Sequence, residues 1–426
     1  MDDKKQPDTI SPQRSIQAGE VEHAKVADDD FEVFKTTTDG VQFRLVGWIK
    51  ASVIFLKSNF RNSHAHCHSI ADMAYVVGGP ILREICGFLF IVAYVLCSGS
   101  GIVGLSVGFN ALSDHAACTV WWAFLAFVAV VASASVRKFE KVGWLSWAGF
   151  FSIYIAVFIV VVGVTTRERP AAAPPTGDYD FGYHAIAYPT FMVGMTATAT
   201  IFVSSAGTSA FLPVISEMRN PRDYNKSVYL CMAIVQSSYL TFSFVVYKYC
   251  GKWVTDPSLG SAGSTLKKAS YGVGLIGLMV SGCLYLHVAA KYVFVRILRD
   301  SPHLQKNSLV HWGTWLSCTI GLGSLAFVLA EAIPIFSFLI ALTGSICFAP
   351  LAIMLPGWLW LHDHGKYRSG GIVKKMIYYG HCFLILLGAF VCVGGTYAVI
   401  KSIIAAYASG LIGSAFSCAD NSGTVH

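Results

Sequence analysis

The chain has 426 residues, of which 54% are hydrophobic and only 13% are charged. A soluble domain carries about 25% charged residues, so too little polar surface is present here for most of the chain to face water. The composition therefore excludes an ordinary soluble protein and favours one embedded in lipid. The net charge of +7 does not indicate nucleic-acid binding, because the basic residues lie in short clusters between apolar stretches.

The N-terminal part is the polar part of the chain. Residues 1–40 have mixed charge and neither an apolar core nor a small-residue cleavage site, which predicts a disordered cytosolic tail rather than a secretory signal. Residues 41–84 begin with an apolar stretch at 45–56 that is too short to cross a bilayer and has Lys50 in its middle. A lysine at the bilayer centre costs at least ~2.5–3.5 kcal/mol. We therefore expect an interfacial helix or half-helix here, followed by a cytosolic loop.

Nine later stretches are long and apolar enough to cross a membrane. Crossing takes about 20 mostly apolar residues in a helix, and a helix satisfies its own backbone hydrogen bonds without water. The stretches predict an all-α polytopic membrane protein with a transmembrane domain over 85–404. They cover residues 85–111, 118–136, 143–164, 189–216, 227–250, 271–298, 309–331, 333–358 and 376–404.

Alternate connections between these stretches are rich in lysine and arginine, and positive loops face the cytosol. The poorer connections include residues 112–117, which hold no basic residue. This alternation predicts a cytosolic N-terminus and an extracytosolic tail over 405–426. The richer connections hold Arg137, Lys138 and Lys141; Arg219, Arg222 and Lys226; Arg296, Arg299 and Lys306; and Lys366, Arg368, Lys374 and Lys375.

The stretch 189–216 contains a run of small and hydroxyl residues, Ser204, Ser205, Ala206, Gly207 and Thr208. As one straight helix, its 28 residues would measure roughly 42 Å, against a bilayer core of about 30 Å. One interpretation is two half-helices with an unwound middle, whose free backbone groups can hold a substrate. The alternative is a continuous helix that packs its small face against a neighbour. The sequence leaves both open.

Other motifs predict packing rather than chemistry. Gly99, Gly101 and Gly104 match the nucleotide-binding pattern GxGxxG, but they lie within an apolar stretch and predict close helix packing. The twelve cysteines are scattered singly and predict neither a disulfide framework nor a zinc site. Lys291, one turn from His287 near a span end, is expected to extend to the membrane interface, with proton coupling as the alternative.

No catalytic constellation can be placed in the sequence. Neither a Ser/His/Asp arrangement, paired carboxylates in a pocket nor a P-loop is recognisable, and no connection is long enough for a nucleotide-binding domain. We therefore expect neither an enzyme nor an ATP-driven pump, and no metal, cofactor or nucleic-acid partner.

Several motifs, taken in order over residues 41–404, resemble the amino acid/auxin permease family and are most similar to its fungal neutral amino-acid permeases. Segment 203–228 resembles the sixth helix and following loop, with Glu217, Met218 and Pro221 in place. Segment 333–361 resembles the tenth helix, including Gly344, Ser345 and Pro356. Residues 247–251 resemble the end of the seventh helix, and residues 68–79 resemble the loop before the third.

The resemblance implies an eleven-helix, LeuT-type core built from two inverted repeats. It implies secondary active transport of neutral amino acids, commonly driven by a proton gradient, with the plasma membrane favoured over the vacuolar membrane. The substrate site would include the unwound part of the sixth helix, at Ser204, Ser205, Ala206, Gly207 and Thr208. The third and eighth helices would flank it, with candidates Tyr94, Ser98, Ser281 and Cys283.

The chain departs from the family pattern near its start. Residues 43–57 resemble the beginning of the first helix, but the sequence then continues as the loop after the second helix. The rest of the first helix and all of the second are missing, roughly 40–50 residues, so the first repeat is incomplete and about nine full helices remain. We expect a neutral amino-acid transporter; the alternative is a non-transporting amino-acid sensor or an inactive shortened product. Oligomeric state stays open.

Overall fold

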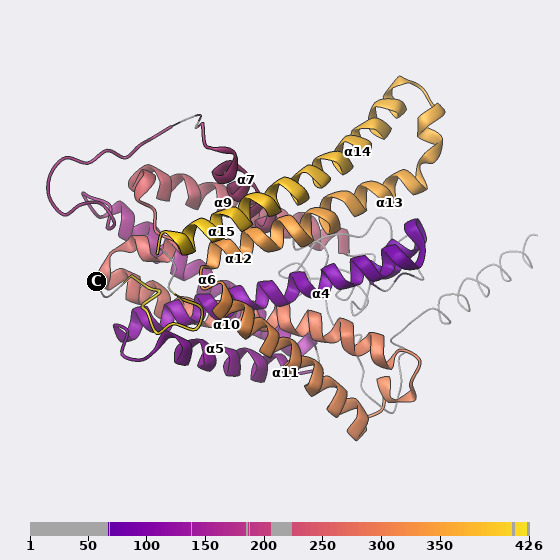
Figure 1. Cartoon of the computed structure of the whole chain (residues 1–426), viewed down its shortest axis with the longest axis horizontal. Helices are drawn as coiled ribbons and strands as arrows, with labels where there is room; N and C mark the ends of the chain where they lie inside the picture. Colours follow the sequence, from indigo (N-terminus) through magenta and orange to yellow (C-terminus); the bar gives the residue numbers. More distant parts are fainter. Residues whose placement is uncertain are drawn as a thin grey trace, which may run out of the picture.

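The computed structural model describes residues 67, 69–137, 139–184, 186, 188–205, 224–410 and 414–423. All regular elements within these ranges are helices, and no strand occurs among them. Most of the long helices run along the longest axis of the molecule (Figure 1). The predicted all-α polytopic architecture is confirmed. The predicted tail over 1–40 and residues 43–57, which resemble the beginning of the first helix, fall before the described part of the chain.

The long helices correspond to the nine predicted stretches. Each is called a rod below, including two rods that consist of two consecutive helices. Seven candidate spans within the described ranges are long and apolar enough to cross a membrane, while α5 and the described part of α7 are shorter. Short 3-10 turns at Gly251–Trp253, Ser258–Ala262, Pro302–Leu304 and Gly365–Ser369 join neighbouring rods. The rods are α4 (Ile70–Ser113), α5 (Thr119–Ala134), α6 (Phe139–Thr165), α7 (Phe191–Ser205), α9 (Tyr224–Cys250), α10 (Ser264–Leu298), α11 (Leu309–Ala332), α12 (Phe336–Thr343) continuing into α13 (Leu355–Asp363), and α14 (Ile372–Phe390) continuing into α15 (Thr396–Ala408).

Helix α4 begins at Ile70, fifteen residues before the predicted span. A capping box starts it: the Asp72 backbone N–H donates to Ser69 Oγ at 3.1 Å, and the Ser69 N–H donates to Asp72 Oδ2 at 3.0 Å. Gly79 then interrupts the helix with φ +68°, immediately before Pro80. The polar residues that suggested a loop at 70–84 are therefore a capped, kinked helical entrance to the span.

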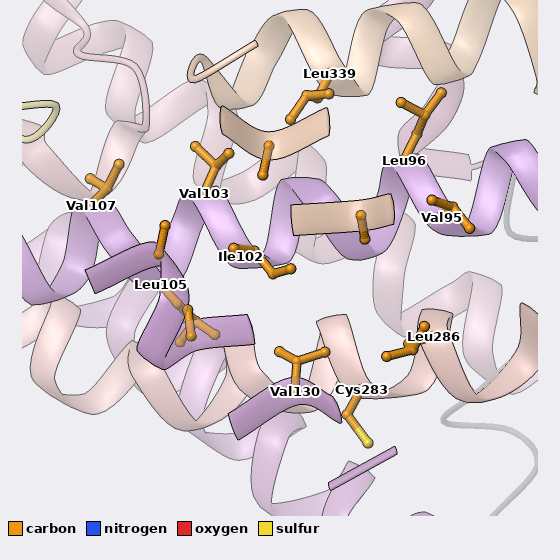
Figure 2. Packing of buried hydrophobic residues seen from close by; sticks show 14 of the residues in the cluster. Val95, Leu96, Ile102, Val103, Leu105, Val107, Val130, Cys283, Leu286 and Leu339 are labelled. Atoms are coloured by element: carbon orange, nitrogen blue, oxygen red, sulfur yellow. The ribbon is translucent and has the colours of Figure 1, made fainter. Parts of the chain in front are cut away.

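Glycines join α4 to α10 at the centre of the bundle. A Cβ atom on Gly101 would lie 2.9 Å from the Cα of Gly282, and one on Gly108 would lie 2.7 Å from the Leu275 side chain. The neighbour of Gly101 is backbone and cannot move aside, so only glycine permits the approach there and the predicted packing role of the glycine motif is confirmed. Figure 2 shows the apolar side chains around this contact, including Ile102 on α4 and Leu286 on α10.

The rod α12–α13 contains a π-helical segment, Gly344–Met354, with Pro350 inside it. Proline cannot donate the backbone hydrogen bond of a regular helix, and a wider turn is one way to accommodate this loss. A second π-helical segment, Val391–Gly395, joins α14 to α15. The two segments contact each other, and Gly395 lies so near Ser345 that a Cβ on the glycine would be 2.9 Å from the Ser345 Cβ.

A disulfide joins Cys118, at the start of α5, to Cys418 in the C-terminal segment. No disulfide framework was predicted from the sequence, and for this pair the prediction is wrong. The two cysteines are 300 residues apart in sequence but have their Cα atoms 4.4 Å apart, a proximity that spacing along the chain cannot reveal. Residues 414–423 are called the C-terminal strap below, and the end of the bundle that carries Cys118 is called the disulfide end.

The opposite end holds the basic connections. Arg137 stacks over the ring of Trp312 at 3.8 Å and donates to Asn307 at 3.4 Å, which joins the α5–α6 connection to the start of α11. Figure 1 shows that the α13–α14 connection and the start of α4 also lie at this end.

Lys291 is only 4% exposed, so the expectation that it reaches the interface is wrong. Its neighbour His287 is fully buried against Trp315, with ring centroids 5.2 Å apart.

Candidate functional site

Two adjoining cavities lie between α6, α7, α9 and α10. The smaller has a volume of about 370 Å³ and is walled by α6, α9 and α10. The larger has about 860 Å³ and is walled by α6, α7, α9 and the segment before α10. Both volumes fall in the range of ~300–1,000 Å³ that is typical of small-molecule sites. They share Val157, Tyr239, Phe242 and Ser243, and we call them the paired cavities.

Helical periodicity explains why these walls face one another. On α9 the positions that line the smaller cavity recur every three or four residues, which places them on one side of the helix. The same spacing holds on α6 and α10. The α9 positions of the smaller cavity are Ile234, Val235, Ser238, Tyr239, Phe242 and Ser243, and its α10 positions are Gly277, Val280, Ser281 and Leu284.

The polar groups of the paired cavities are hydroxyls and one amide. The Tyr154 and Ser238 hydroxyls are hydrogen-bonded at 2.7 Å between α6 and α9. The Tyr239 hydroxyl donates to the backbone oxygen of Ser204 at 3.4 Å, which joins α9 to α7. Gln236 supplies the amide. No charged side chain lines either cavity within the described part of the chain. Such a lining can bind neutral polar and apolar groups but offers no counter-ion.

Two of the predicted site residues line the paired cavities. Ser281 lies on the α10 wall of the smaller one, and Ser204 lines the larger one. Ser204 is near the described end of α7 and donates its hydroxyl to the Ile201 carbonyl at 2.6 Å. Ser205 is the last helical residue described, with a backbone position only. Ala206, Gly207 and Thr208 lie outside the described residues, so the helix break stays a prediction.

The other three predicted residues lie in the packed contact between α4 and its neighbours. Tyr94 is fully buried, with its ring centroid 4.5 Å from Phe90 and 6.1 Å from Phe348. Ser98 donates its hydroxyl to the Gly282 carbonyl at 3.2 Å. Cys283 is fully buried, and Figure 2 places it beside Val130. The structure thus brings Ser204 and Ser281 to adjoining cavities, whereas Tyr94, Ser98 and Cys283 take part in helix packing.

Sequence reasoning missed Tyr154, Gln236, Ser238 and Tyr239. A usable signal was present, because residues 236–243 read QSSYLTFS within an otherwise apolar stretch. Polar residues that recur at helical spacing within a membrane span face the protein interior or a cavity more often than lipid. Total hydropathy, which predicts a span here, does not register that spacing.

Comparison with known proteins finds similarity to membrane transporters over most of the chain. The family model "Transmembrane amino acid transporter protein" matches residues 54–401. A "Transmembrane transporter" of Fusarium pseudograminearum (strain CS3096) is 43% identical, with 96% of this chain and 95% of that protein covered. One of Gibberella moniliformis (strain M3125 / FGSC 7600) is 44% identical, with 92% of each covered. The "N amino acid transport system protein" of Neurospora crassa is 26% identical, over 84% of this chain and 76% of that protein.

The alignment with the Fusarium protein also contains gap positions on the side of this chain. It extends over 453 positions, whereas this chain has 426 residues. At least 27 positions, the difference between the two numbers, therefore have no counterpart here. The relative is longer than this chain within the region that the two share. A longer relative is expected if this chain lacks most of the first helix and all of the second.

Proposed function

Because the chain belongs to the transmembrane amino acid transporter family, we propose that it carries neutral amino acids across a membrane by secondary active transport. The family is one of membrane transporters and not of enzymes. To this family membership the proposal adds a substrate class, a driving ion and a cellular membrane.

The uncharged lining of the paired cavities carries the proposal of neutral substrates. A substrate with a charged side chain would have to bury that charge among hydroxyls, aromatic rings and one amide, without a counter-ion on the described walls. Burying an unpaired charge is costly. A neutral side chain meets no such cost, and the apolar residues of the lining add favourable contact area.

Proton coupling is the proposed driving force. It is supported by the resemblance to amino acid/auxin permeases, which commonly use a proton gradient. His287 and Lys291 are two buried titratable groups within the membrane-spanning bundle, and ionisable residues in such positions often serve in proton movement. Alternating access by rocking of LeuT-type repeats completes the proposed mechanism.

We place the disulfide end on the extracytosolic side, with the N-terminus in the cytosol and the chain in the plasma membrane. Disulfides form in oxidising compartments, and the basic connections lie at the opposite end, as the positive-inside rule expects. A fluorescent tag on the full chain tests the membrane assignment, because label confined to the vacuolar membrane would contradict it.

Competition for uptake tests the substrate class. The full chain is reconstituted in liposomes and uptake of a radiolabelled neutral amino acid is measured with unlabelled amino acids in excess. We expect neutral amino acids to reduce uptake, while aspartate and lysine do not. Equal competition by aspartate or lysine would reject the proposed neutrality without rejecting transport.

A non-transporting amino-acid sensor, or an inactive shortened product, is the second candidate. The gap against the Fusarium relative favours it, because this chain lacks residues that a transmembrane transporter of the same type contains. Amino-acid binding without uptake would select the sensor. Sequencing the transcript across codons 56 and 57 tests the missing helices directly, because an intervening exon would restore the first repeat.

A further inference from the structure

A third cavity lies at the disulfide end, beneath the C-terminal strap. Its volume is about 490 Å³. Strap residues form one side of it, and the end of α11, the start of α12 and the turn at Asp256 and Pro257 form the others. Because none of its lining residues belongs to the paired cavities, it is a separate space on the membrane side that we propose to be extracytosolic.

The strap is held over this cavity by several independent contacts. The Cys118–Cys418 disulfide fixes its middle. Asn421 accepts a hydrogen bond from the buried Asn110 at 2.8 Å and donates to Ser106 at 3.0 Å, so it reaches into the α4 helix. The Thr119 hydroxyl donates to the Ala419 carbonyl at 2.6 Å, and Lys267 Nζ donates to the Ser422 carbonyl at 2.7 Å. Together these contacts hold the strap in a fixed position, where it forms one wall of the cavity.

Glu331 places a buried carboxylate on the wall of this cavity. Glu331 is 5% exposed and lies one position before the C-terminal end of α11. The C-terminus of a helix carries partial negative charge, which disfavours a carboxylate there. Within the described ranges, Glu331 has no hydrogen-bond or ion-pair partner. Burying a charged carboxylate without a cation is costly, and a positively charged ligand bound beside Glu331 would offset that cost.

None of the basic groups described near this end pairs with Glu331. Lys268 pairs with Asp114 at 2.7 Å, and Lys267 donates to the strap. Two further carboxylates, Asp256 and Asp420, line the same cavity, and Asp420 accepts from the Ser422 backbone N–H at 2.8 Å. Among the described residues, the lining therefore contains three acidic side chains and no lysine or arginine.

The chemistry of the lining distinguishes between kinds of cation. A divalent metal such as calcium needs six to eight oxygen ligands close together. Asp256, Glu331 and Asp420 do not come together as a group of three metal ligands in the described structure. A primary ammonium group needs only a few hydrogen-bond acceptors, and one buried carboxylate with neighbouring backbone carbonyls and hydroxyls can supply them.

We propose that the cavity beneath the strap is a binding site for a primary ammonium group, with Glu331 as its anionic partner. The ammonium group is that of an amino acid on its way to the paired cavities; this identity of the ligand rests on the proposed function, whereas the site itself does not. A free alkylammonium ion has the same chemistry and is the other source that the experiment distinguishes.

Protection of a cysteine placed in the cavity tests the site without requiring transport. Ser337→Cys puts a thiol on the cavity wall, and a membrane-impermeant maleimide is added to vesicles that hold the full chain, with the parent chain giving the background. We expect L-alanine and methylammonium to slow labelling, and N-acetyl-L-alanine, which lacks the ammonium group, not to. Adding Glu331→Gln should raise the half-protecting concentration about tenfold or more, because a charge-assisted hydrogen bond is lost.

Two further variants complete the experiment. Glu168→Gln removes an exposed carboxylate from the connection after α6 and should leave protection unchanged. Glu331→Asp keeps a carboxylate and should restore part of the protection, which separates loss of charge from misfolding.

Each outcome has a definite meaning. Three outcomes overturn the proposal: equal protection by N-acetyl-L-alanine, protection that survives Glu331→Gln, or failure of both L-alanine and methylammonium to protect. Protection by methylammonium alone keeps the ammonium site but rejects the amino acid as its ligand. Glu331-dependent protection in a chain that shows no uptake rejects transport and keeps the site.

Discussion

At the scale of single residues, packing and binding positions can be separated by what surrounds them. Gly101 faces the backbone of Gly282, whereas a Cβ added to Gly313 on α11 would meet no atom within 4 Å. Gly101→Ala should lower stability by about 1–3 kcal/mol through overpacking, while Gly313→Ala should raise it slightly, since alanine favours helix. Thermal unfolding of the two purified variants measures this. Equal melting temperatures would contradict the close α4–α10 contact.

Tyr239 lines both paired cavities and also joins two of the helices around them. Its hydroxyl bonds to α7 and its side chain lines both cavities. Tyr239→Phe should raise the KM for uptake roughly two- to tenfold, the effect of one neutral hydrogen bond. Tyr229→Phe is the matched control, because Tyr229 lies on the same helix but is 76% exposed. If both variants have the KM of the parent chain, Tyr239 has no part in substrate binding.

At the scale of elements, hydropathy located the rods but not their ends or partners. Apolar stretches of about 20 residues are a strong signal, and all nine correspond to helical rods. The start of α4 was missed because a capping box is polar, and its serine and aspartate look like loop residues. The paired cavities were missed because they arise where helices distant in sequence converge, and hydropathy contains no information on helix neighbours.

The strap is the element whose attachment is most easily tested. Of the twelve cysteines in the sequence, Cys118 and Cys418 form the disulfide and the other ten are free. Denatured, unreduced chain should therefore accept ten maleimide–polyethylene glycol groups, and reduced chain should accept twelve. Cys118→Ser should show eleven in both states, since Cys418 then has no partner. Twelve groups on unreduced parent chain would mean that the strap is not covalently attached.

At the scale of the whole molecule, the two ends of the bundle differ in chemistry. One end carries the basic connections, the Arg137–Trp312 contact and the kinked start of α4. The other carries the disulfide, the strap and a cavity with the buried Glu331. Loop charges predict that the basic end faces the cytosol, because lysine and arginine concentrate in cytosolic connections. The disulfide, which no sequence spacing revealed, is the second feature on which the proposed orientation rests.

The central proposal is that this chain transports amino acids, although its first repeat is shortened, through helices that retain an uncharged cavity. Gradient-driven accumulation tests this most directly. The full chain is reconstituted in liposomes with an alkaline interior, and entry of a radiolabelled neutral amino acid is followed with and without a protonophore. We predict accumulation above the external concentration that the protonophore abolishes. Entry no greater than into empty liposomes, with the gradient intact, would contradict transport by this chain.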